Sequence, residues 1–178
     1  MPKIHLIAGL PRSGSTLLCN LLNMNPKFHA TATSPLLDVI RNIRSTFSHN
    51  VTYKSHNRLE EVDNIKRATK AFIENYYDQD KEVIFDKSRG WTSNLNILDE
   101  IMGNKDSKII WTYRDPVEII SSIEKHYQKT LMFESSDEAG GLDFSTLESR
   151  VNVFINDNGI VARPVWALND AYDMGLQD

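Results

Sequence analysis

The sequence predicts an α/β fold of three layers, in which helices flank a central parallel sheet. Short apolar runs occur at residues 4–8, 81–86 and 108–113, and segments with helical apolar periodicity separate them. Because parallel strands need crossover connections, strands that alternate with helices indicate a parallel sheet. A glycine-bounded turn also joins the first strand to the first helix. We expect residues 1–178 to form a single domain.

The first strand, Ile4–Ala8, precedes a helix predicted over residues 14–24, which Asn25-Pro26 ends. Cys19 lies on this helix and is interpreted as a small buried apolar residue. The apolar face of this first helix consists of four leucines, Leu17, Leu18, Leu21 and Leu22. After the helix, an extended piece is predicted over residues 27–31.

A second helix is predicted from Ser34-Pro35, with serine as the cap and proline in the first position. A third helix follows over about residues 59–76. A buried strand over 81–86 then precedes a helix over 93–102, which Gly103 ends.

The next strand covers residues 108–113, and Asp115 caps the helix that follows, with Glu118 as the capping-box partner. A second capping box, Ser145 to Glu148, opens another helix. A last helix is predicted over residues 164–174.

The turn at residues 9–16, Gly9-Leu10-Pro11-Arg12-Ser13-Gly14-Ser15-Thr16, is called the glycine loop below. It keeps the spacing of a phosphate-binding P-loop, except that serine replaces the lysine at position 15. Such a loop directs backbone N–H groups into one concavity, and the next helix adds the positive end of its dipole. The sequence therefore predicts an anion site in a P-loop-type fold, with Arg12 as the positive charge.

A second anion site is predicted at Arg114, which follows a strand at the edge where open α/β sheets bind ligands. Ser122 lies about two helical turns after the cap on nearly the same side, whereas Ser121 is less well directed. Arg114 and Ser122 could hold one phosphate between them. In the alternative interpretation, Arg114 only pairs with a surface carboxylate.

Together these motifs resemble those of sulfotransferases that use 3′-phosphoadenosine 5′-phosphosulfate (PAPS). The glycine loop with Leu17-Leu18 is similar to their 5′-phosphosulfate loop, and Arg114-Asp115-Pro116 with Ser122 is similar to their 3′-phosphate motif. The resemblance covers roughly residues 3–130. It is closer to the protein-tyrosine and bacterial branch than to the cytosolic small-molecule branch.

The resemblance implies transfer of a sulfuryl group from PAPS to an acceptor hydroxyl or amine, leaving 3′-phosphoadenosine 5′-phosphate (PAP). It assigns catalytic roles to Lys87 and Arg12 and implies no metal. The donor would be bound by Arg12, Ser13, Gly14, Ser15, Thr16 and Leu17 at its sulfated end, and by Arg114 and Ser122 at its 3′-phosphate.

The general base is not assigned. Relatives place a glutamate soon after the first helix or a histidine two residues after the lysine, but residues 30–35 contain no carboxylate and Arg89 occupies the second position. The remaining candidates are Asp38, Asp86, His29, His49 and His56. Arg89 and Trp91 are predicted either to line an acceptor cleft or to be a surface arginine and a core tryptophan.

Composition limits the partners. A net charge of −4 and a pI near 5.7 do not favour nucleic acid or an anionic membrane. The acceptor could be a small molecule, a glycan or a peptide, and the sequence indicates no oligomeric state. A single cysteine agrees with a reducing compartment, so we expect a cytoplasmic protein.

Two other functions remain open. One is a P-loop kinase in which Asp86 holds magnesium, although Ser15 in place of lysine argues against it. The other is a fragment that binds PAP without catalysis, because relatives continue beyond the position of Asp178 and we expect C-terminal elements to be missing.

Overall fold

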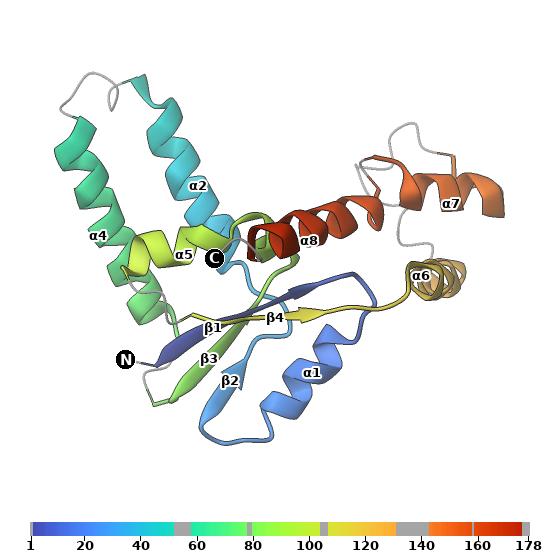
Figure 1. The fold of residues 1–178 in the computed structure, drawn as a ribbon, viewed down its shortest axis with the longest axis horizontal. Coiled ribbons are helices and arrows are strands. Elements are labelled where there is room, and N and C mark those ends of the chain that lie inside the picture. The colour runs from blue at the N-terminus through green and yellow to red at the C-terminus, as the bar shows by residue number, and fades with distance from the viewer. Residues whose placement is uncertain are drawn as a thin grey trace. The chain divides into compact units, whose positions relative to one another are not determined.

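The computed structural model describes residues 2–51, 58–77, 80–103, 107–130, 143–157 and 159–175 (Figure 1). Four parallel strands form one sheet in the order β2-β3-β1-β4, and helices flank it. The predicted three-layer α/β fold of the P-loop type is therefore confirmed. The strands are β1 (Lys3–Gly9), β2 (Phe28–Ala30), β3 (Val83–Lys87) and β4 (Ile109–Thr112).

The helices lie within a few residues of their predicted positions. One difference is a 3-10 turn, η1 (Arg89–Ser93), which lies before α5. The Ser88 side chain caps this turn by accepting a hydrogen bond from the N–H of Gly90. The helices of the described residues are α1 (Ser15–Leu22), α2 (Leu36–His49), α4 (Arg58–Tyr76), α5 (Leu95–Met102), α6 (Pro116–Thr130), α7 (Leu147–Ile155) and α8 (Ala162–Gly175).

The chain divides into two compact units. Unit 1 consists of Met1–Ala8 and Thr16–Ile110, and unit 2 consists of Gly9–Ser15 and Trp111–Asp178. All of the glycine loop except Thr16 therefore belongs to the same unit as α6. The expectation of a single domain stays a prediction.

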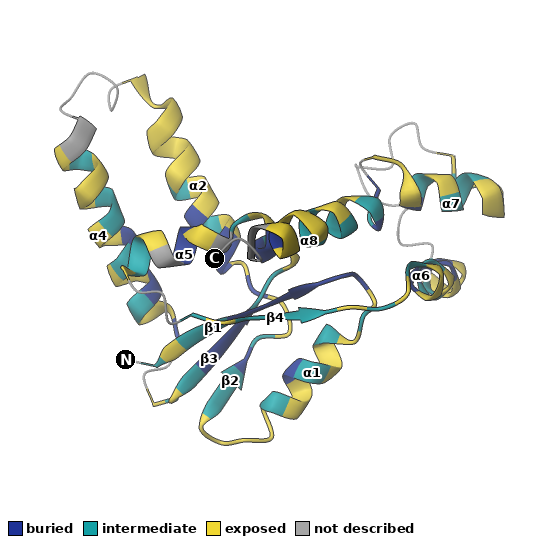
Figure 2. Ribbon diagram, in the orientation of Figure 1, coloured by how far each residue is buried: buried dark blue, intermediate teal, exposed yellow. Residues whose placement is uncertain are grey.

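The core of unit 1 lies on both faces of the sheet. Figure 1 shows α1 on one side of the strands and α2, α4 and α5 on the other. β1 pairs with β3 in a parallel register from Lys3↔Val83 to Ile7↔Lys87, and burial covers the C-terminal part of β1 and the middle of β3 (Figure 2). Strands covered on both faces are largely apolar, and the buried Asp86 of β3 is an exception.

The predicted apolar face of α1 is half wrong. Leu18 and Leu22 pack on the core around Cys19, but Leu17 and Leu21 are 63% and 56% exposed. Positions four residues apart share one side of a helix, so one pair of leucines covers the sheet and the other points away. Cys19 itself is buried, as predicted.

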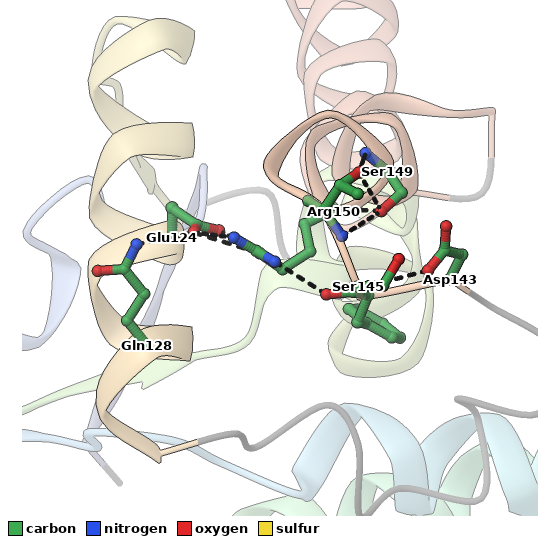
Figure 3. A network of polar contacts seen from close by, with 8 residues as sticks. Glu124, Gln128, Asp143, Ser145, Ser149 and Arg150 are labelled. Carbon is green, nitrogen blue, oxygen red and sulfur yellow. Dashed lines mark hydrogen bonds and ion pairs between the residues drawn. The ribbon is translucent and has the colours of Figure 1, made fainter.

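Unit 2 has its own apolar core, formed by Leu10, Ile119, Ile123, Phe154 and Val161. A largely buried ion pair accompanies it, in which Arg150 of α7 reaches Glu124 of α6 (Figure 3). The Arg150 Nη2 and Nε atoms donate to Glu124 Oε1 and Oε2 at 2.7 and 3.0 Å, and Nη1 donates to the carbonyl of Phe144 at 2.8 Å. Because both charges are satisfied, this pair can fix the start of α7 on α6.

Two predicted capping boxes differ in detail. Asp115 does cap α6, accepting from the N–H of Val117 at 2.7 Å, but Glu118 pairs with Arg114 and does not close a box. At α7 the box is one residue later than predicted, with Thr146 and Ser149 exchanging hydrogen bonds. No helix in the described ranges combines the length and apolarity needed to cross a membrane.

Candidate active site

The glycine loop approaches the end of β4 so closely that position 9 must be glycine. The Leu10 N–H donates to the Thr112 carbonyl at 3.0 Å. Gly9 has φ 137°, and a Cβ atom there would lie 2.2 Å from the Thr112 oxygen. The first glycine therefore allows β4 to hold the loop, as the P-loop spacing predicts.

Ser13 closes the loop from inside. Its hydroxyl lies 2.5 Å from the Leu10 carbonyl oxygen and 2.6 Å from Thr112 Oγ1. Gly14 has φ 91°, and a Cβ atom added there would meet no atom within 4 Å, so the space beside its backbone is open. An open backbone before a helix N-terminus suits an anion.

Arg12 connects the two predicted motifs within unit 2. Its Nε atom donates to Ser122 Oγ at 3.1 Å, and its carbonyl oxygen accepts from Arg114 Nη1 at 3.2 Å. Arg12 has φ 59°, a left-handed conformation that is costly for a residue other than glycine. The structure thus brings Arg12, Arg114 and Ser122 together.

Arg114 also has a carboxylate partner. Its Nε atom lies 2.8 Å from Glu118 Oε2, one turn along α6. The alternative considered for Arg114, a surface ion pair, is therefore present beside the contact with the loop. The Ser121 hydroxyl donates to the Val117 carbonyl at 2.9 Å, so it turns back onto its own helix.

Lys87, at the end of β3 in unit 1, reaches the last residue of the glycine loop. Its Nζ atom donates to Thr16 Oγ1 at 2.9 Å. Its own backbone is held on both sides, since the N–H donates to Thr31 Oγ1 at 2.8 Å and the carbonyl accepts from the Ser34 N–H at 3.0 Å. Burial lowers the pKa of Lys87, and the nearby Arg89 adds to this effect.

Asp86 is neither a general base nor a magnesium ligand in this structure. The residue is fully buried, Trp91 Nε1 donates to its Oδ1 at 2.6 Å, and the Tyr77 hydroxyl donates to its Oδ2. Burial raises the pKa of Tyr77, as does the neighbouring Asp86, so the phenol keeps its proton. The carboxylate anchors Tyr77 and Trp91, which is a core tryptophan.

The other candidates for the general base lie as follows in the structure. The His29 ring lies 5.8 Å from the Tyr77 ring, and His49 Nδ1 lies 2.9 Å from the Ser45 carbonyl near the end of α2. Asp38 is on the first turn of α2. His56 lies outside the described residues. The base stays unassigned.

Sequence reasoning missed Thr31, Ser34, Tyr77 and Trp91 as supports of the Lys87 segment. Thr31 and Ser34 follow the predicted extended piece in the sequence, but nothing local pairs them with residue 87. The Thr31 hydroxyl and the Ser34 N–H contact the Lys87 backbone from more than 50 residues away, and these contacts depend on the pairing of β2 with β3.

A hollow of about 270 Å³ lies among α2, α4 and α5 of unit 1. Its wall is mainly aliphatic, and Lys66 and Glu100 form a 2.8 Å ion pair at it. Its lining contains no residue of the glycine loop or of β3, so it is distinct from both. Within the described residues, no group of three or more His, Cys, Asp or Glu side chains could hold a metal ion.

A comparison with protein families extends over most of the chain. The sequence profile described as the Sulfotransferase family matches residues 5–153, a range that contains the glycine loop, Lys87, Arg114 and Ser122. No curated protein matches the chain. A match of this extent establishes that the chain belongs to the sulfotransferase family.

Proposed function

We propose that this sulfotransferase takes its sulfuryl group from PAPS and transfers it to a hydroxyl or amine of an acceptor, releasing PAP. One observation carries the proposal: Arg12 of the glycine loop, Arg114 and Ser122 converge within unit 2. Two guanidinium groups and a hydroxyl beside a loop of open backbone N–H groups form a donor set that fits a nucleotide with two anionic ends.

The residues fit this donor without a P-loop lysine or a metal bridge. A sulfuryl group carries less negative charge than a phosphoryl group, so Ser15 in place of lysine is compatible with its transfer. The backbone of Ser13, Gly14, Ser15 and Leu17, with the Thr16 hydroxyl, would surround the sulfated phosphate at the N-terminus of α1.

The reaction forms a bond from the acceptor oxygen or nitrogen to sulfur while the bond from sulfur to the bridging oxygen breaks. The electron pair of that bond stays on the phosphate oxygen of PAP, and the proton of the acceptor is released to the solvent. Lys87 and Thr16 are hydrogen-bonded to each other and are the donors we assign to the leaving oxygen. Donors that are already oriented stabilise developing charge with little reorganisation.

Calorimetric titration tests the donor. We expect PAP to bind and ATP with magnesium to bind far more weakly, because the loop has no lysine for the β and γ phosphates. Binding of magnesium-ATP without PAP would instead identify a kinase, which the burial of Asp86 already disfavours.

Transfer is then measured with [35S]PAPS and a panel of phenols, sugars, amines and tyrosine peptides. Label in any acceptor class supports the enzyme, and PAP binding without transfer to any of them supports a binding protein that lacks catalysis. We further propose a cytoplasmic location, because a single cysteine suits a reducing compartment.

A further inference from the structure

We propose that the hollow among α2, α4 and α5 is a second ligand site, which binds a small apolar molecule with a single carboxylate head group. All of its lining residues belong to unit 1, and none belongs to the glycine loop or to β3. The proposal therefore does not depend on the function proposed above.

The wall of the hollow is apolar and large enough for a ligand. α4 packs against both α2 and α5, and isoleucines at helical spacing point into the space between them (Figure 1). The volume of about 270 Å³ is nearly twice the roughly 150 Å³ of an apolar cavity that binds benzene, so the hollow would hold about ten carbon atoms. The isoleucines are Ile40 and Ile43 of α2, Ile65 of α4, and Ile97 and Ile101 of α5.

The hollow is accessible from solvent beside Phe47 and Val62. Both residues belong to its lining, and they are 38% and 37% exposed. A ligand can therefore enter without separation of the helices. An apolar wall with a few placed polar groups is the usual composition of a small-molecule site.

One polar group in the wall is a buried hydroxyl. Thr69 of α4 lines the hollow and is 4% exposed. Within the part of the chain that the structure describes, its hydroxyl forms no hydrogen bond. A buried hydroxyl without a partner is costly, and a ligand with a polar head group would remove that cost.

The charged residues of the lining leave one positive charge uncompensated. Lys66 Nζ lies 2.8 Å from Glu100 Oε1, so these two charges cancel. The hydrogen bond from Lys66 lowers the pKa of Glu100, and the nearby charge of Arg44 adds to this effect. Arg44 itself forms no hydrogen bond or salt bridge with a residue of the described ranges.

This charge balance selects the head group. Lys66 and Thr69 lie three residues apart on the same side of α4, so the hydroxyl is one turn from the charged cluster. A carboxylate can accept hydrogen bonds from the Arg44 guanidinium and from the Thr69 hydroxyl. A neutral head group would leave Arg44 without a counter-charge, and a cationic one would be repelled.

Three probes with the same chain of ten carbons test the head group: decanoate, decanol and decylamine. Calorimetric titration of the full chain, below the micelle concentration of each probe, measures their affinities. Arg44→Gln removes the uncompensated charge, and Glu100→Gln removes the negative charge of the lining. Arg67→Gln is the matched control, because Arg67 contacts Asn64 on the surface of α4 and does not line the hollow.

We expect one decanoate to bind per chain, decanol to bind several times more weakly, and decylamine to bind least. Arg44→Gln should weaken decanoate about tenfold, as loss of a charge-assisted hydrogen bond does, and should leave decanol within about twofold. Glu100→Gln should strengthen decanoate, because it removes a like charge beside the head group. Arg67→Gln should change neither probe.

Thr69→Val adds a readout that does not require a ligand. It replaces the hydroxyl by a methyl group, so the melting temperature of the ligand-free protein should rise while decanoate binds more weakly. A lower melting temperature with unchanged decanoate affinity would exclude this hydroxyl from the site.

Other results would overturn the proposal. One is the absence of saturable decanoate binding, and another is an equal loss of decanoate and decanol in Arg44→Gln. Lys87→Ala should leave decanoate within about twofold, so a larger loss would place the probe at the proposed site of sulfuryl transfer. A dimer that Arg44→Gln dissociates, with no decanoate bound, would assign the hollow to a second copy of the chain.

Discussion

Gly9 and Gly14 belong to the same loop, but the space available for a Cβ atom differs between the two positions. At Gly9 a Cβ atom would overlap the backbone oxygen of Thr112 at 2.2 Å, whereas at Gly14 it would meet no atom within 4 Å. We expect Gly9→Ala to lower the free energy of unfolding by about 3 kcal/mol and Gly14→Ala by about 1 kcal/mol, the latter from its positive φ alone. Urea unfolding of the two variants measures this difference, and equal losses would contradict it.

Lys87 should give the reaction an alkaline limit. Its ammonium donates only while protonated, and burial lowers the pKa of this lysine. Activity should therefore fall as the pH rises through a value below the ordinary lysine pKa of about 10.4. Lys87→Arg keeps its charge at these pH values, so its profile should stay flat to higher pH, although its rate is lower because the fork geometry differs.

The pH dependence of kcat/KM for the two forms measures this effect. Lys27→Arg is the matched control. Lys27 forms an exposed ion pair with Glu82, so this substitution should not change the pH at which kcat/KM falls. An alkaline limb that is identical in the unmodified protein and in Lys87→Arg would exclude Lys87 as its source.

At the residue scale, the sequence predicts those residues that belong to short motifs. The loop glycines, Arg12, Arg114 and the cap of Asp115 lie within motifs whose members are a few residues apart. Asp86 could not be interpreted in this way. Its role follows from Tyr77 and Trp91, which meet it only when β3 is buried between layers.

At the element scale, the junction of β3 with η1 supports the site. Tyr77→Phe leaves one oxygen of the buried Asp86 without its donor, so we expect a loss of about 2 kcal/mol in unfolding free energy. If the junction also positions Lys87, kcat should fall more than KM for PAPS rises. In a Lys87→Ala background the effect of Tyr77→Phe on kcat should disappear, whereas the loss of stability should remain.

A double-mutant cycle compares the unmodified protein, Tyr77→Phe, Lys87→Ala and the double variant. It separates the effect of Tyr77 on the position of Lys87 from its effect on the stability of the fold. A Tyr77→Phe effect on kcat that persists without Lys87 would show that the junction acts on the reaction by another route.

The stability contributed by the ion pair of Glu124 in α6 with Arg150 in α7 should depend on pH in the acidic range. Hydrogen bonds from Arg150 lower the pKa of Glu124, with a further contribution from Gln128. Stability from this group is therefore complete above the unfolded pKa of about 4.3 and is lost as the pH falls through the lower folded value. Glu124→Gln should lower the melting temperature at pH 7 by about 5 °C and should weaken the acid dependence below about pH 4.

Thermal unfolding at pH 7 and pH 3 measures both effects. Glu82→Gln, which removes an exposed partner 62% accessible to solvent, should leave the melting temperature nearly unchanged. Equal shifts in the two variants would mean that the Arg150 contacts contribute no more than a surface pair.

Periodicity predicts the helices but not which side of a short helix is covered. The leucines of α1 form two pairs, and only packing on Cys19 and the sheet selects Leu18 and Leu22. The shift of the α7 cap from Ser145 to Thr146 is a similar case, since two adjacent hydroxyl residues offer equivalent local signals.

For the whole molecule, ligand binding should appear as stabilisation. PAP at about 100 times its dissociation constant should add about 2.7 kcal/mol to the folded state and raise the melting temperature. Arg114→Ala should remove most of this shift at the same PAP concentration, and adenosine should produce none in either protein. A shift that persists in the variant would place PAP elsewhere.

At this largest scale, the alternation of strands and helices is enough to predict the α/β class. The division into two compact units is not visible in the sequence, because the boundary crosses the glycine loop between Ser15 and Thr16, inside one motif. The two units are defined by contacts between residues far apart in the sequence, and these contacts exist only in the folded chain.

The burial of Trp91 has a practical consequence. Its indole is fully enclosed in unit 1 and donates to Asp86, whereas Trp166 of unit 2 is 48% exposed. Iodide should therefore quench the fluorescence of Trp166 and spare that of Trp91. In a protein with Trp111→Phe and Trp166→Phe, Trp91 is the sole indole, and a red shift of its emission during denaturation would report the opening of the β3–η1 junction separately from the melting of α8.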